Sequence, residues 1–196
     1  MPRFRDDTPG GIAEFSPSGG ATRCVEYHAG VMDQKRAMLR HFLAALAYRT
    51  QKALRDAPES FGGFACGSKV RTPAELLGHM TSVLGYARTH FVGGRYWPEP
   101  LADLAAEAAR FHDMLKDLAG HLEAGTPLRG ITEEQLLQGP FADAMTHAGQ
   151  LAMLRRLSGS PVPPENFVVA AIDPENLGSA QPAPVSPDPD WPERPS

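Results

Sequence analysis

The sequence lacks the features that would place the protein in a membrane, outside the cell or on a nucleic acid. No apolar run approaches the roughly 20 residues of a membrane-spanning helix, and residues 1–15 hold no apolar stretch typical of a secretory signal. The net charge is −4, whereas phosphate binding needs a basic face. We therefore expect a cytoplasmic protein with no nucleic-acid partner and no membrane partner.

Cysteine is also scarce, with two residues in a chain of 196, Cys24 and Cys66. Neither belongs to a CxxC pair or to a metal-knuckle spacing, so we expect no structural zinc knot. Thiols in a chain without a secretory signal usually stay reduced. The sequence therefore predicts two free cysteines rather than a disulfide.

Apolar residues recur with the period of an α-helix in four long stretches, near residues 30–55, 72–92, 100–123 and 140–157. The second stretch has the clearest start, because Thr72 is a good N-cap, Pro73 suits the first helical position and Glu75 can close a capping box. Thr132 and Gln135 predict the same box for a short helical piece. No stretch shows a convincing strand alternation.

Four long helices with short connections predict an all-α fold, an up-down four-helix bundle over residues 30–177. Residues 1–29 are rich in turn-forming Gly and Pro and are expected to form an irregular N-terminal arm. Residues 178–196 contain six prolines and are expected to form an extended or disordered tail.

The candidate functional residues lie on two of these helices. Asp143 and His147 are four residues apart, just over one turn, so their side chains leave the same helix face. His79 lies one turn into the second helix, between Leu76 and Val83, which read as core positions. Metal sites in helix bundles are built from such inward carboxylates and i,i+4 pairs. The sequence therefore predicts that His79, Asp143 and His147 bind a divalent cation.

Plainer explanations exist for each of these residues. A buried histidine bonded to a backbone carbonyl would explain His79 alone. A solvent-facing pair worth a few tenths of a kcal/mol would explain Asp143 and His147. The apolar residues of the same helix favour the metal site, because polar residues on an inward face need partners. The other helix and arm histidines are expected to have no functional role, since single matches are weak signals; they are His28, His41, His112 and His121.

Three further residues are candidates for a pocket beside the metal. His90 lies about three turns after His79 on roughly the same face, and Tyr86 could offer a hydroxyl group there. Gln150 shares the helix face of His147. Core packing for Tyr86 and a position at the bundle rim for His90 are the simpler alternatives.

Two imidazoles and one carboxylate leave coordination positions open. With zinc, such a site lowers the pKa of a bound water or thiol and supplies a nucleophile near neutral pH. Zinc or nickel is the expected metal, and iron or manganese would fit the same ligands because affinity does not settle identity. Non-haem iron oxygenases share this ligand set, but they also need a site for oxygen and a cosubstrate.

With these residues in view, the chain resembles the DinB-like superfamily of metal-binding four-helix bundles, from about Gly30 to Ile172. The resemblance rests on TPAELLGHM at 72–80 and DAMTHAGQLAMLRRLSGSPVPPENF at 143–167. Members typically carry one histidine early in the second helix and an HxxxH pair before Gly-Gln in the last. His79 and His147 match this pattern, and Asp143 stands where the first histidine of the pair is usual.

The resemblance implies a divalent-metal-binding bundle, often a homodimer, with relatives that include transferases and an isomerase dependent on low-molecular-weight thiols. On this basis we expect a divalent-metal-dependent enzyme that transfers a low-molecular-weight thiol to a small-molecule substrate. Two alternatives stay open. One is a metal-dependent hydrolase, and the other is a non-catalytic metal- or ligand-binding bundle in stress response.

Overall fold

The computed structural model describes residues 23–188 and 190, with side chains from Gln34 onward. Within these ranges the chain is helical and has no strand, apart from one isolated antiparallel bridge between Glu165 and Pro187. The long helices are α1 (Arg23–Leu54), α2 (Pro73–Val92), α3 (Leu104–Glu123) and α5 (Ala142–Leu157). The short elements are η1 (Glu59–Gly63), α4 (Glu133–Leu136), the π-turn η2 (Leu137–Phe141) and η3 (Phe167–Val169).

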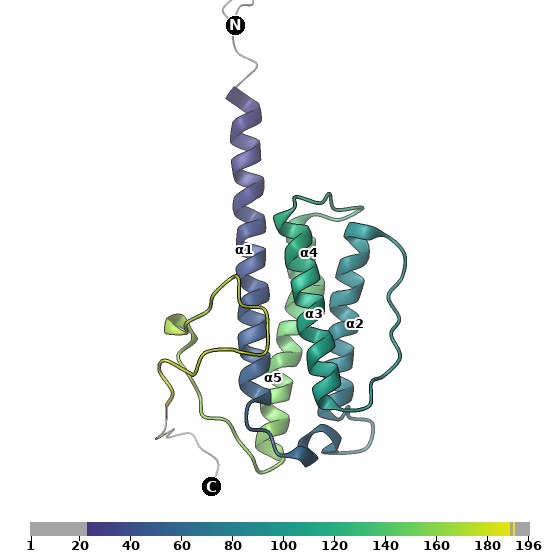
Figure 1. Cartoon of the computed structure of the whole chain (residues 1–196), viewed down its shortest axis with the longest axis vertical. Coiled ribbons are helices and arrows are strands. Elements are labelled where there is room, and N and C mark those ends of the chain that lie inside the picture. The colour runs from purple at the N-terminus through teal and green to yellow at the C-terminus, as the bar shows by residue number, and fades with distance from the viewer. Residues whose placement is uncertain (1–22, 189, 191–196) are drawn as a thin grey trace, which may run out of the picture.

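The four long helices form the expected all-α four-helix bundle. Both α1 and α2 pack against α3 and α5, so that α1 and α2, although consecutive in the chain, occupy opposite corners (Figure 1). One continuous apolar core lies between the helices, and its largest fully buried rings are those of Tyr48, Phe61, Phe91, Phe111 and Phe141.

The directions of the helices depart from a simple up-down order. α2 and α3 run parallel. Two contacts show this: Gly78 approaches Glu107 near the start of both helices, and Arg88 bonds Asp117 farther along both. The cause is the connection 93–103, which runs back along the length of the bundle (Figure 1), whereas a short connection joins antiparallel neighbours. An extended chain covers about 3.3 Å per residue, so this segment matches the roughly 30 Å length of the 20-residue α2.

Capping signals in the sequence placed two helix starts correctly. The Thr72 hydroxyl accepts a hydrogen bond from the backbone N–H of Glu75, and the Glu75 carboxylate accepts one from the backbone N–H of Thr72 at 2.8 Å. Thr132 and Gln135 form the same reciprocal pair at the start of α4. Both predicted capping boxes are therefore confirmed.

The start of α3 was placed too early by the sequence. The helix begins at Leu104 rather than near Pro100, because Asp103 is its N-cap and accepts a hydrogen bond from the N–H of Ala106 at 2.8 Å. The residues before Asp103 belong to the long connection. This difference matters for function, because the connection forms one wall of the candidate site.

The first helix starts earlier than expected. α1 begins at Arg23 and not near Gly30, so residues 23–29 of the expected irregular arm are helical. Residues 1–22 lie outside the described residues. The helix ends at Leu54, next to its predicted end at Arg55.

The chain after α5 runs along the outer side of α1 in mostly extended conformation (Figure 1). Glu165 accepts a 2.5 Å hydrogen bond from the hydroxyl of Tyr48. Farther on, the carbonyls of Gln181 and Pro182 accept hydrogen bonds from the guanidinium of Arg55. The described part of the proline-rich tail is therefore extended and bonded to the bundle.

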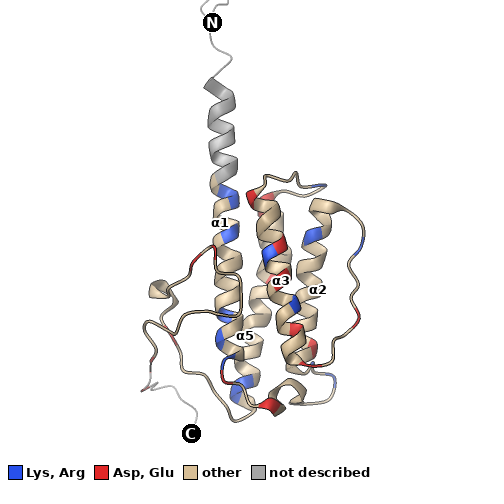
Figure 2. Cartoon of the chain, viewed as in Figure 1, with Lys and Arg blue, Asp and Glu red and all other residues tan. Residues whose placement is uncertain are grey.

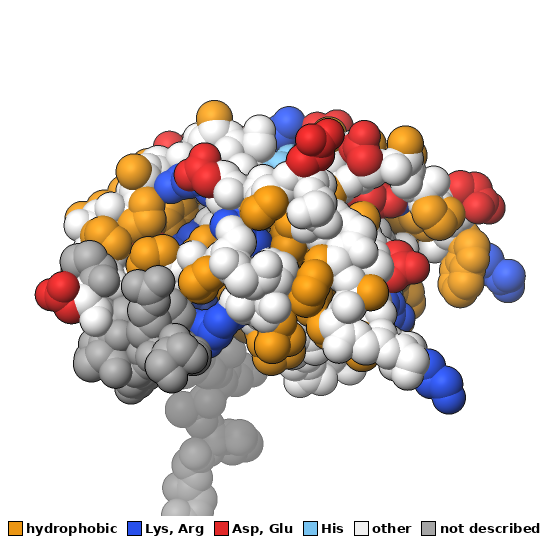
Figure 3. Space-filling model, turned by 90° about the horizontal axis from the view of Figure 1, so that it is seen from below, with side chains coloured by type: hydrophobic (Ala, Val, Ile, Leu, Met, Phe, Trp, Pro, Cys, Tyr) orange, Lys and Arg blue, Asp and Glu red, His pale blue; other side chains and the backbone are white. Residues whose placement is uncertain are grey.

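Basic side chains recur along α1, and acidic ones lie on the neighbouring elements (Figure 2). Lys35 forms a 2.6 Å ion pair with Glu134 of α4, which ties two elements distant in the sequence. The lower end of the molecule mixes hydrophobic and polar side chains (Figure 3). In the part of the chain that the structure describes, no helix is both long and apolar enough to cross a bilayer.

Candidate metal centre

A kink before α5 positions the first ligand candidate. Gly139 has φ −91° and ψ −105°, which is not helical, and Pro140 follows it within η2. Proline has no N–H to donate, so the regular helical bonding is interrupted here. The chain then enters α5 with Asp143 in its first turn, where the helix dipole stabilises a negative charge.

The structure brings the three predicted ligands together. The Asp143 Oδ1 atom lies 3.4 Å from Nε2 of His147. Two ligand atoms bound to one zinc ion at a tetrahedral angle lie about 3.3–3.5 Å apart, so this pair already has a suitable separation. One ligand atom from each of His79, Asp143 and His147 lies within 4.8 Å of the others, and reaching a tetrahedral separation needs a shift of at most about 1.5 Å. The group could therefore hold a metal ion.

His79 reaches the pair from the facing helix α2. Its ring and that of His147 meet edge to face, with centroids 4.8 Å apart and planes at 73°. Burial lowers the pKa of His79, and the positive charge of Arg71 lowers it further. A lowered pKa keeps the imidazole neutral at physiological pH, which is the form that binds metals.

Gln150 orients His147. The Nδ1–H of His147 donates a 2.8 Å hydrogen bond to Oε1 of Gln150. This bond fixes the tautomer, so the lone pair is on Nε2, the nitrogen that faces Asp143. Ligating histidines are commonly held in this way by a partner on the other nitrogen. Gln150 is thus placed behind the ligand and does not line the cleft.

The three residues are less buried than an inward face would make them. The side chain of Asp143 is 52% exposed and that of His147 12% exposed, and His79 is half-buried. The sequence interpretation of core-facing polar residues was therefore too strict, since His79 and Asp143 line a cleft rather than the apolar core, and His147 lies beside them without lining it. That position leaves a bound cation accessible from solvent.

The cleft beside the ligands has a volume of about 1490 Å³. One wall is α2, from Arg71 just before it to Thr89, and the opposite wall is the connection 94–100. The end of η2 and the first turns of α5 close one end, so that His79 and Asp143 both line the cleft. A volume of this size can enclose a small-molecule ligand.

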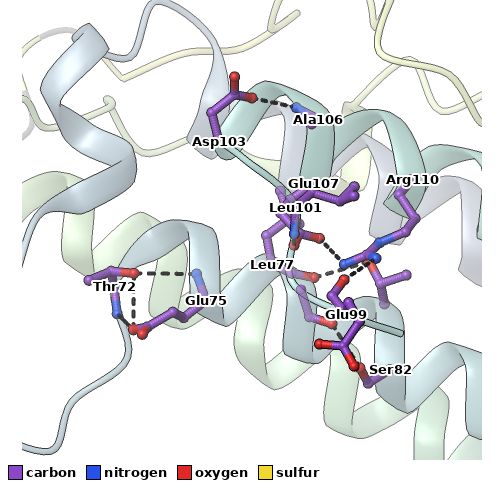
Figure 4. A network of polar contacts seen from close by, with 12 residues as sticks. Thr72, Glu75, Leu77, Ser82, Glu99, Leu101, Asp103, Ala106, Glu107 and Arg110 are labelled. Carbon is purple, nitrogen blue, oxygen red and sulfur yellow. Dashed lines mark hydrogen bonds and ion pairs between the residues drawn. The ribbon is translucent and has the colours of Figure 1, made fainter. Parts of the chain in front are cut away.

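Two charged residues of α3 hold the connection in place. Buried Glu107 accepts a 2.8 Å hydrogen bond from the backbone N–H of Leu101, and Arg110 donates one of 2.8 Å to the carbonyl of Glu99 (Figure 4). Glu107 and Arg110 also form a 2.5 Å ion pair. Sequence reasoning missed this role, because the third helix was expected to start near Pro100 and Leu101 was placed inside it.

A glycine in α2 admits an aromatic ring of the same connection. A Cβ atom built on Gly85 would lie 2.0 Å from Cδ1 of Tyr96, so no larger residue fits without moving the ring. Tyr96 is thereby seated on α2, and its neighbour Trp97 lines the cleft. A Gly inside a helix costs about 1 kcal/mol relative to Ala, and close approach of another group is the kind of reason that retains it.

The predicted pocket residues separate in the structure. Tyr86 lines the cleft and is 57% exposed, so the alternative of core packing is wrong for it. His90 packs edge to face on Tyr86 and lies 3.1 Å from the carbonyl of Arg129 through Nδ1. It does not line the cleft and lies at the bundle rim.

The remaining histidines lie away from the ligands. His112 is buried on α3, where its Nδ1–H donates a 2.8 Å hydrogen bond to the carbonyl of Leu177. His41 is exposed, and His121 stacks on Phe91. Cys66 is free and exposed, and it does not line the cleft. The side chains of His28 and Cys24 lie outside the described residues.

Comparisons with known proteins add no relative. No family model matches the chain, and no curated protein or solved structure is similar to it at a significant level. The geometry of the site is therefore the basis for its proposed function.

Proposed function

We propose that the protein is a divalent-metal-dependent enzyme of the DinB-like type that joins a low-molecular-weight thiol to an electrophilic small molecule. The observation that carries the proposal is a group of two imidazoles and one carboxylate from two helices at the edge of a large cleft. Three protein ligands with an open side are typical of catalytic sites, whereas structural sites are closed by four. The opening favours catalysis over a purely binding role.

A divalent cation at this site would lower the pKa of a thiol or water bound to it and supply a nucleophile near neutral pH. His79, Asp143 and His147 would hold the cation, with zinc or nickel as the expected ion. In the reaction, the thiol would release its proton to solvent, its sulfur would form a bond to the electrophilic carbon, and the bond from that carbon to the leaving group would break, with its electron pair going to the leaving group. No cysteine of the described side chains lines the cleft, so the thiol is external.

The first test is metal content. Protein purified without an affinity tag should contain about one divalent cation per chain by plasma mass spectrometry. His79→Ala and His147→Ala should each remove most of it and leave the helical circular dichroism unchanged. His41→Ala, which alters an exposed histidine outside the site, is the matched control. Full occupancy in the His147→Ala protein would refute the assignment.

The hydrogen bond between Gln150 and His147 gives an independent check that His147 binds the metal. Gln150→Leu removes the acceptor for the Nδ1–H of His147 but leaves all three ligands in place. Loss of such a partner typically weakens metal binding by 10–100-fold, and about tenfold is expected for this half-exposed pair. Unchanged affinity in a competitive titration would show that His147 binds no metal through Nε2.

The reaction class is tested with the cobalt-substituted protein. Biological thiols should shift its visible spectrum, and one of them should be consumed in the presence of a chloro-aromatic compound or an epoxide. His79→Ala should abolish both effects. If no thiol changes the spectrum but an ester is hydrolysed, the enzyme is a hydrolase. If neither occurs while metal is bound, the non-catalytic alternative is correct.

A further inference from the structure

The wall of the cleft opposite α2 carries an aromatic ring that the fold does not use. Trp97 is 93% exposed, although tryptophan is among the most costly residues to leave in water. Within the described residues it makes no ring contact and no hydrogen bond of its own. Its presence therefore contributes little to stability, and a ligand face for the ring explains it better.

Trp97 is nevertheless held in position. Tyr96, just before it, is seated over Gly85, and Pro98, just after it, fixes its own φ near −65° and restricts the backbone of Trp97. The carbonyl of Glu99 is bonded to α3. An exposed ring on a fixed backbone can bind a flat ligand with little further loss of entropy.

Across the cleft, α2 presents a second aromatic ring. Tyr86 lines the same cleft with 57% of its surface exposed. It lies seven residues after His79, so about 10 Å of helix separates it from the ligand group. Trp97 and Tyr86 thus offer stacking surfaces to a flat molecule whose other end approaches the ligand group.

The charge of the cleft favours an anion. The charges of three arginines and three carboxylates that line the cleft cancel; the six residues are Arg71, Arg95, Arg110, Glu75, Glu107 and Asp143. A bound divalent cation would therefore leave the lining with a net charge of +2. Arg110 and Glu107 neutralise each other in their ion pair. Glu75 is engaged by the N-cap of α2.

Arg71 is the cation next to the ligand group. Its side chain is exposed, lines the cleft and makes no hydrogen bond or ion pair with the other described residues. Arg71 and His79 both line the cleft, and the charge of Arg71 adds to burial in lowering the pKa of that imidazole. A guanidinium in this position can form a two-bond contact with a carboxylate, and such contacts are about twice as strong as neutral hydrogen bonds.

We propose that the electrophilic substrate is a flat aromatic carboxylate, stacked on Trp97 and Tyr86 with its carboxylate bound to Arg71. This inference rests on the proposed function for the reacting end of the molecule. It adds the substrate class, which the ligand group alone does not specify. The aromatic part explains the exposed rings, and the carboxylate explains the unpaired arginine.

The test uses 2-naphthoate as the probe, with neutral 2-naphthalenemethanol and non-aromatic acetate as comparisons. Equilibrium dialysis on the zinc-loaded protein should give a dissociation constant for naphthoate about tenfold below that of the neutral analogue, with acetate weaker than both. In a Trp191→Phe background Trp97 is the sole tryptophan, and naphthoate should quench its fluorescence.

Variants assign the two contacts separately. Arg71→Gln should remove the preference for naphthoate over its neutral analogue. Trp97→Ala should weaken both by roughly three- to tenfold, the range expected for one aromatic stack. Lys116→Gln makes the same charge change on α3, where Lys116 pairs with Asp113 outside the cleft, and should change neither. Equal binding of the two naphthalene probes, or unchanged binding in both cleft variants, would overturn the proposal.

The outcome separates this inference from the proposed function. Metal content and thiol consumption are measured without naphthoate, so a metal enzyme that ignores the probes would retain its function and lose this substrate class. The aromatic rings and Arg71 do not need the metal to bind the probes. Selective binding of naphthoate to protein without metal would therefore support the inference even if the enzyme proposal failed.

Discussion

Histidines on the two sides of the bundle differ in burial and in hydrogen bonding. On the side of α2 and the connection 93–103, His79 borders an open cleft, and among the described residues its ring contacts that of His147 and makes no hydrogen bond. On the side covered by the chain after α5, His112 is buried and bonded to Leu177. What lies over a helix face, and not the residue type, decides whether a histidine is structural or available for chemistry.

The covering segments explain the difference. The chain after α5 lies directly on α1 and buries Leu177, so the polar groups beneath it must pair with one another. The connection 93–103 is instead bonded to α3 by Glu107 and Arg110 (Figure 4), and it forms a wall of the cleft. One segment fills its side of the bundle and the other leaves a cleft.

Removing the covering segment should have the largest effect. Deletion of residues 173–196 exposes the site of Leu177 and removes the acceptor of His112, so we expect a loss of about 3–5 kcal/mol in unfolding free energy. Deletion of 178–196 removes the carbonyl partners of Arg55 and should cost about 1–2 kcal/mol. Urea denaturation of both proteins measures the difference, and equal losses would show that Leu177 does not anchor the segment.

Replacing each of the two histidines by alanine should have the next largest effect and sharpens the comparison. His112→Ala leaves the carbonyl of Leu177 without its donor and should destabilise the protein by about 2–4 kcal/mol, with metal content unchanged. His79→Ala should change the stability of the metal-free protein by less than about 1 kcal/mol but abolish metal binding. Denaturation and plasma mass spectrometry on both variants test this. If His112→Ala protein remained folded but lost its metal, His112 would not be a purely structural residue.

Alanine substitutions of two glycines compare the stability contributed at the cleft wall with that at an open helix surface. Gly85→Ala places a methyl group against the ring of Tyr96 and should destabilise the protein by about 1–3 kcal/mol. Gly120→Ala in α3 meets nothing within 4 Å and should stabilise it by about 0.5–1 kcal/mol. Thermal unfolding measures both. A neutral Gly85→Ala variant would mean that Tyr96 is not fixed on α2.

The smallest expected effect is a dependence of stability on pH. Burial lowers the pKa of His112, which outweighs the opposite influence of its hydrogen bond to Leu177. The unfolded chain therefore binds a proton more readily than the folded one, so stability from this group is full above the ordinary histidine pKa of about 6.5 and falls as the pH drops below it. His112→Leu should flatten this decline between pH 7 and 5 in denaturation experiments. An unchanged slope would assign the decline to other groups, including His79, whose pKa is also lowered.

The sequence by itself determined the helices and the ligand group. Capping boxes at Thr72 and Thr132 act over three residues, and the i,i+4 spacing of Asp143 and His147 fixes a shared face whatever the surroundings. These features are local, so they can be read along the chain. His79 was found because its polar ring interrupts an apolar helix.

Only the tertiary structure decided the parallel course of α2 and α3, the cleft and its aromatic wall. The connection was expected to be short, with the third helix starting near Pro100, yet Asp103 is the cap and the preceding residues run along the bundle. Glu107, Tyr96 and Trp97 acquire their roles from that course. Contacts between segments far apart in sequence depend on the path of the chain in space, and no local spacing records that path.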